Sequence, residues 1–152
     1  FLTSAAALAA VTTDDQKKFG VLGIAGLFIW IIGFVIEITA DEQKRRFRNE
    51  VNDQGHQVNR GTFIRSGLWK YSRHPNYFGE ITLWIGIAVI ALPVLSGWTF
   101  VTLVSPLFVY LLLSKVSGIP MLEASANKRW GDNPEYQRYK KETPVLFLKF
   151  RR

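Results

Sequence analysis

The feature that most constrains this chain is an uncharged run of 34 residues, from Ile81 to Ser114, in a protein of only 152 residues. A soluble domain of this size has little room to bury so long an apolar segment. Uncharged runs of about 18 or more residues are instead typical of membrane-spanning helices. A second run, from Phe19 to Ile36, has 18 residues without a charge. The sequence therefore predicts an all-α integral membrane protein.

The longer run is predicted to form a helical hairpin. As one helix it would measure about 51 Å, well beyond the hydrocarbon thickness of a bilayer. Pro93 and Gly97 are turn formers, and we place the turn at 92–97. The second arm, Trp98 to Ser114, is long enough to span and is expected to bend at Pro106.

The first arm of the hairpin, Ile81 to Leu92, has only 12 residues and is short for a crossing. We therefore expect its helix to begin near Asn76 or Tyr77. Asn76 and Glu80 would then lie at the bilayer edge, where polar side chains are costly unless they are paired or line a cavity.

The fold expected is a single membrane domain, residues 1–152, with about three full transmembrane helices, the end of a possible earlier one within residues 1–13, and short helices on one side. Gly23, Gly26 and Gly33 in the first span favour either close helix packing or the ordinary glycine content of membrane helices. There is no cysteine, and the two histidines lack metal-ligand spacing, so no metal site is expected.

Charge predicts the orientation. Of the 19 basic residues, 16 lie in two blocks, Lys44–Arg73 and Lys128–Arg152, and the turn between the hairpin arms has no charge. Both blocks are expected on one face, which the positive-inside rule places in the cytoplasm or its equivalent, as for a bacterial inner, endoplasmic reticulum or organelle membrane. Membrane lipids are the expected partners and nucleic acid is not. Arg60 and Lys149 are among the charges assigned to setting the topology and contacting anionic lipid.

A charged segment directly after the first span has a spacing that topology alone does not explain. If that helix extends beyond the membrane, Glu37, Asp41, Lys44, Arg45 and Arg48 lie along one face. A solvated, self-paired helix would explain this spacing. However, Glu37 lies at the membrane boundary, where ionisable residues indicate function.

The second pattern precedes the hairpin. Pro75 favours the first turn of a helix, and the free amides of residues 76–78 would form its positive end, an anion site. Arg73 could bind a phosphate there, with Tyr71 or Trp69 stacking on a planar ring. The alternative is an interfacial aromatic belt whose arginine contacts lipid phosphate.

The basic tail follows the hairpin. It predicts a helix from Met121 to Trp130, a turn, and a further helix beginning at Pro134. Tyr136 and Tyr139 share one face of that last helix. This face is either an amphipathic surface lying on lipid or one wall of a cofactor site.

Several ordered motifs carry a family resemblance: "EITADEQKRRFR", "GLWKYSRHPNYFGEITLWIGIAVIALP", "SPLF", "SGIPMLE" and "KRWGDNPEYQRYK". Together they resemble the DUF1295 membrane proteins, which belong with the steroid 5-alpha-reductase C-terminal domain group, over roughly residues 20–147. More distantly, "RHPNY" is similar to an element of sterol C14-reductases and isoprenylcysteine carboxyl methyltransferases. The resemblance implies a membrane oxidoreductase acting on CH-CH groups, which transfers hydride from NADPH to a C=C bond of a lipid or steroid-like enone.

The resemblance also implies site residues. A D-x6-R element corresponds to Asp41 and Arg48, with Arg45 or Lys128 expected at the 2′-phosphate, and Tyr71 or Tyr77 is a candidate proton donor. The candidate cofactor-binding residues, from the resemblance and the charge patterns together, are Glu37, Asp41, Arg45, Arg48, Tyr71, Arg73, His74, Asn76, Tyr77, Glu80, Lys128, Arg129, Trp130, Tyr136 and Tyr139.

Two departures keep alternatives open. In the reductases the substrate-protonating residues lie on earlier helices, and residues 1–13 offer no acid. The chain could therefore be a non-catalytic accessory subunit of a larger membrane complex. The methyltransferases, which use S-adenosylmethionine (SAM), have a paired acidic element where this chain has the single Glu123. This departure weakens the alternative of a SAM-dependent membrane methyltransferase without removing it.

Overall fold

The computed structural model describes residues 20–149, and this part of the chain is helical without a β-sheet. Three of its helical segments are long and apolar enough to cross a membrane, which confirms the predicted all-α membrane fold. The possible earlier helix within residues 1–13 lies outside the described residues. The α-helices are α2 (Val21–Asn49), α3 (Pro75–Ala91), α4 (Val104–Leu111), α5 (Ile119–Trp130) and α6 (Pro134–Glu142).

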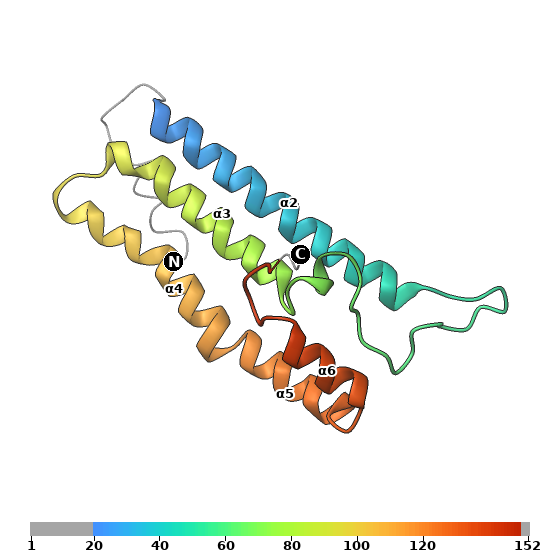
Figure 1. Ribbon diagram of the computed structural model, residues 1–152. Coiled ribbons are helices and arrows are strands. Elements are labelled where there is room, and N and C mark those ends of the chain that lie inside the picture. Colours follow the sequence, from blue (N-terminus) through green and yellow to red (C-terminus); the bar gives the residue numbers. More distant parts are fainter. Residues whose placement is uncertain (1–19, 150–152) are drawn as a thin grey trace.

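Helices α2 and α3 pack closely along a seam of glycines, which contribute no side chain to hold the backbones apart (Figure 1). A Cβ added at Gly33 would lie 2.7 Å from the carbonyl oxygen of Gly79, and one at Gly26 would lie 2.8 Å from that of Gly86. Such distances are far below van der Waals contact. Gly26 and Gly33 therefore serve close packing, the first of the two alternatives drawn from the sequence.

The hairpin forms where the sequence predicts it. Helix α3 begins at Pro75, and a 3-10 turn at Leu92–Val94 ends the first arm. The second arm differs from the expectation, because it is not one helix bent at Pro106. A 3-10 helix, Gly97–Leu103, precedes α4, so Pro106 lies in the first turn of an α-helix, where its missing N–H leaves no carbonyl unpaired.

A π-helical turn, Leu112–Val116, joins α4 to α5 and was not predicted. Beyond α5, Asn133 caps α6 by accepting hydrogen bonds from the amides of Glu135 and Tyr136. The turn and the start of α6 at Pro134 agree with the sequence-based prediction.

The bundle has two unlike ends (Figure 1). The turn after α3 lies at one end with the start of α2. The other end carries the C-terminal part of α2, the start of α3, and helices α5 and α6. The described residues of both basic blocks thus lie at one end of the helices. A small core of Ile81, Val109, Ile119 and Leu146 ties α3, α4 and α5 to the C-terminal segment.

Candidate functional site

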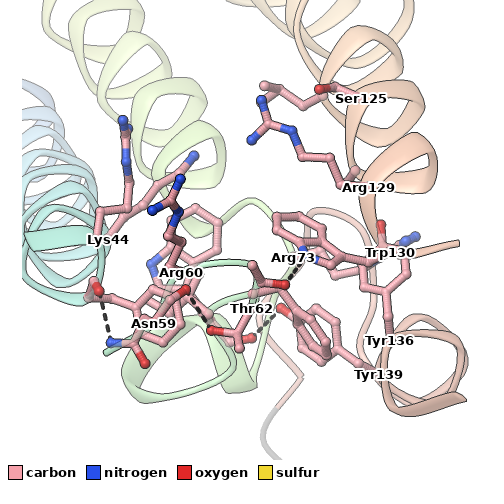
Figure 2. Close-up of a pocket in the computed structure, with 18 of the residues that line it drawn as sticks. Lys44, Asn59, Arg60, Thr62, Arg73, Ser125, Arg129, Trp130, Tyr136 and Tyr139 are labelled. Carbon is pink, nitrogen blue, oxygen red and sulfur yellow. Dashed lines mark hydrogen bonds between the residues drawn. The ribbon is translucent and has the colours of Figure 1, made fainter. Parts of the chain in front are cut away.

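A cavity of about 840 Å³ opens at the basic end of the bundle, between α2, the connection from α2 to α3, and helices α5 and α6 (Figure 2). This volume lies in the range of cofactor and ligand sites, about 300–1,000 Å³. The cavity is lined by Lys44, Phe47, Arg48, Asn49, Gln57, Asn59, Arg60, Gly61, Thr62, Phe63, Ile64, Trp69, Arg73, His74, Leu122, Glu123, Ser125, Ala126, Arg129, Trp130, Tyr136 and Tyr139.

The lining is strongly cationic. Lys44 and Arg48 come from α2, Arg60 from the connection, and Arg129 from α5, and Figure 2 shows Lys44 and Arg129 on facing walls. Among residues 20–149, none of these four side chains forms a salt bridge with a carboxylate. The cavity therefore presents a net positive charge to any anion that enters.

Glu123 is the only carboxylate in the described lining, and it is fully engaged. One of its oxygens accepts a hydrogen bond from Nη1 of Arg73 at 2.6 Å, and the other lies 2.9 Å from Nε2 of His74. These bridges join α5 to the residues before α3. They leave Nε of Arg73 and Nδ1 of His74 buried without a hydrogen-bond partner in the described part of the chain.

An aromatic cluster forms the wall on the α6 side. The ring of Phe63 lies 5.2 Å from that of Tyr136, 5.4 Å from that of Tyr139 and 5.9 Å from that of Trp130, centroid to centroid. The Tyr139 hydroxyl donates to the carbonyl oxygen of Trp69 at 2.6 Å. Burial raises the pKa of the Tyr139 phenol above its usual value, so it remains a hydrogen-bond donor at physiological pH.

Hydrogen bonds and ring contacts fix the connection between α2 and α3 so that its residues 59–64 line the cavity. The Trp130 indole donates to the carbonyl oxygen of Gly61 at 2.6 Å, and the Asn59 amide donates to that of Phe47 at 2.9 Å. Phe63 adds its ring contacts. These anchors explain why Arg60, in a surface segment, lines the cavity.

The predicted site residues divide into two groups. Arg48, Arg73 and Tyr139, which are far apart in sequence, line one cavity. The full set of predicted residues that line it is Arg48, Arg73, His74, Arg129, Trp130, Tyr136 and Tyr139.

The other predicted residues do not line this cavity. Arg45 is exposed and paired with Glu42, Lys128 is exposed, and Tyr71 lines a separate groove beyond Tyr139. A further set lies along α2 and in the first two turns of α3. The members of this set are Glu37, Asp41, Asn76, Tyr77 and Glu80.

Sequence reasoning missed several lining residues. Arg60 was assigned to topology, and Lys44 was noted on the charged face of α2 but not chosen. Asn59, Thr62 and Phe63 lie in a segment without periodicity, which gave no signal. The single Glu123 was read only as evidence against methyl transfer, although the abundance of cations around it could have suggested a paired carboxylate.

These features define an integral membrane protein with a cationic, aromatic-walled cavity at one end of its helices. Residues 1–143 match the family described as "Protein of unknown function (DUF1295)", and the chain belongs to this family. This agrees with the resemblance drawn from the sequence motifs.

The chain is also similar in sequence to several curated steroid reductases. The chain is 34% identical to "3-oxo-5-alpha-steroid 4-dehydrogenase 1" of Bos taurus over 60% of this chain and 32% of the relative. It is 30% identical to the Macaca fascicularis protein of the same name, over 91% of this chain and 46% of that relative. It is 36% identical to "Steroid 5-alpha-reductase DET2" of Gossypium hirsutum, over 50% of this chain and 27% of that relative. The chain thus spans less than half the length of these relatives, and no solved structure matches it.

Proposed function

We propose that this chain forms the cofactor-binding part of a membrane-embedded, NADPH-dependent reductase that acts on the C=C bond of a lipid or steroid-like enone. The observation that carries the proposal is the cavity that the two basic blocks build at one end of the helices. The names of the curated steroid reductases support the reductase class.

The donors of the cavity fit NADPH. The cofactor carries a pyrophosphate and a 2′-phosphate, and the cavity offers Lys44, Arg48, Arg60 and Arg129 without carboxylate partners in the described residues. Guanidinium groups bind phosphate oxygens in pairs. The rings of Trp130 and its aromatic neighbours offer flat surfaces for a heterocycle.

The structure changes which residues we assign to the phosphates. Arg73 was expected to bind a phosphate, but Glu123 already holds its guanidinium. Arg45 and Lys128, expected at the 2′-phosphate, do not line the cavity. We therefore assign the phosphates to the four unpaired cations, and Arg73 to anchoring the wall that contains Glu123.

When bound, NADPH supplies the hydride. The chain's own residues bind and orient the cofactor and keep water from the apolar helices beside it. Of the two candidate proton donors, Tyr71 lines the separate groove, whereas Tyr77 stacks on His74 and lies beside Gly118, where an added Cβ would be 3.0 Å from its ring. We therefore favour Tyr77 as the donor to the oxygen of the enone.

Equilibrium binding to the purified chain tests the proposal. NADPH should bind, NADH should bind more weakly because it lacks the 2′-phosphate, and SAM should not compete. The relatives lend no support to SAM as the cofactor. Tighter binding of SAM than of NADPH would favour the methyltransferase. Binding of neither would favour an accessory subunit of a larger complex.

A further inference from the structure

A second, smaller groove lies on the far side of Tyr139 from the cavity. Its volume is about 380 Å³, and Tyr139 lines both spaces. We call it the lysine groove; it is lined by Arg65, Lys70, Tyr71, Glu135, Arg138, Tyr139, Glu142, Thr143, Pro144 and Lys149.

Two lysines dominate the charge of the lysine groove. Its two arginines have acidic partners, since Arg65 pairs with Glu135 at 3.0 Å and Arg138 with Glu142 at 3.2 Å. Lys70 and Lys149 form no salt bridge with any carboxylate in residues 20–149. The paired arginines and acids cancel, so the lysines give the groove a net positive charge.

Both lysines adjoin Tyr71, Lys70 through its ammonium group and Lys149 through its backbone amide. The Lys70 ammonium lies 5.9 Å from the centre of the Tyr71 ring, and the amide of Lys149 donates to the Tyr71 carbonyl at 3.0 Å. The amide of Arg73 donates to the Pro144 carbonyl at 2.9 Å. The C-terminal segment is thereby bound to the residues that precede α3.

The same segment carries an exposed apolar side chain beside a membrane-spanning helix. Phe147 is 66% exposed, and its ring packs against Phe78, in the first turn of α3, at 6.2 Å. Because α3 is one of the three helices that can span the membrane, Phe147 lies close to where that helix enters the bilayer. Aromatic residues are favoured at this depth.

We propose that the lysine groove binds the headgroup of an anionic phospholipid, with the phosphate between Lys70 and Lys149 and Phe147 among the first acyl carbons. Basic residues and an apolar anchor at the membrane edge match the two parts of such a molecule. A soluble anion would use the charges but not the neighbouring apolar side chain. The proposal does not depend on the function of the main cavity.

Lipid titration followed by native mass spectrometry tests this on the purified full chain. Phosphatidylglycerol should bind about thirtyfold more tightly than phosphatidylcholine, as expected when two lysines each contribute about 1 kcal/mol near an anionic headgroup. The double variant Lys70→Gln/Lys149→Gln should lose this preference. The variant Lys70→Arg/Lys149→Arg should keep it.

The matched control is Lys128→Gln/Lys141→Gln, which removes two exposed charges that do not line the groove. It should leave the preference intact, and an equal loss would mean that net charge, not the groove, attracts the lipid. Displacement of phosphatidylglycerol by millimolar inorganic phosphate would identify a site for soluble anions and overturn the proposal. An unchanged preference in the glutamine variant would also overturn it, provided that circular dichroism shows the variant folded.

Discussion

At the residue scale, Arg129 and Lys128 are neighbours on α5, but only Arg129 lines the cavity. We expect Arg129→Gln to weaken NADPH binding about tenfold or more, because a hydrogen bond to a charged group contributes about 1.5–3 kcal/mol. Lys128→Gln should change the affinity little. Calorimetric titration of both variants checks this, and equal losses would show that the cavity acts only through overall charge.

Glu123 is expected to stabilise the fold through Arg73 and His74. The Arg73 and Glu123 side chains are only 11% and 20% exposed, so Glu123→Ala would leave a largely buried guanidinium without its partner. We expect a loss of about 2–4 kcal/mol in the free energy of unfolding, close to the values for buried pairs. The control is Glu135→Ala, whose exposed pair with Arg65 should cost less than about 1 kcal/mol. Thermal unfolding in detergent measures both; similar losses would contradict the assignment.

The buried phenol of Tyr139 is expected to make the folded protein less stable at alkaline pH. Because burial raises the pKa of Tyr139 in the folded protein, the unfolded chain gives up this proton first as pH rises. The contribution of Tyr139 is therefore fully present below about pH 10, the usual tyrosine pKa, and is lost as pH rises further. Tyr139→Phe should flatten the fall in melting temperature from about pH 10 upward, measured against wild type. Parallel curves would show that Tyr139 does not control this fall.

The residues of the site were only partly predictable from the sequence. Arg48 and Tyr139 could be chosen because helical spacing shows which side chains share a face, and Arg129 because the family resemblance extends over the basic, aromatic tail. The contact between Arg73 and Glu123 could not, because it joins residues that are 50 positions apart and on different elements. Only the packing of α5 beside the start of α3 creates it.

At the element scale, the glycine seam between α2 and α3 is the feature most sensitive to side-chain size. Gly33→Leu would place a side chain against the backbone of Leu83 and Gly79 and force the helices apart. We expect a loss of about 1–3 kcal/mol or more, as for overpacked cores. Val35→Leu, on the exposed face of the same helix, should be nearly neutral. Thermal unfolding compares the two, and a neutral Gly33→Leu would mean that the helices do not pack this closely.

The helices themselves were predictable where hydropathy and turn formers agree. Charge-free length fixed the spans, and proline fixed the starts of α3 and α6. The 3-10 helix before α4 and the π-turn after it were not predictable. These differ from an α-helix only in which carbonyl each N–H reaches, and neither hydropathy nor turn formers distinguish these hydrogen-bond patterns.

At the scale of the whole molecule, the cavity exists because both basic blocks lie at the same end of the helices. One membrane span separates each basic block from the turn between the hairpin arms. This arrangement was predictable because it follows from the spans alone. The path of the connection between α2 and α3 was not, since nothing in its sequence shows that Trp130 holds it over the cavity.

Which side of the membrane the basic end faces is open to a direct test, because the chain has no cysteine. Gln54→Cys lies in the exposed connection at the basic end, and Ser96→Cys lies in the turn at the other end. The positive-inside rule predicts that a membrane-impermeant maleimide labels Ser96→Cys on intact cells and reaches Gln54→Cys only after the membrane is opened. The reverse labelling pattern would show that the basic end faces the outside of the cell. Labelling of both from one side would mean that the three helices do not all cross, and a cavity facing soluble NADPH beside a membrane-borne substrate would lose its basis.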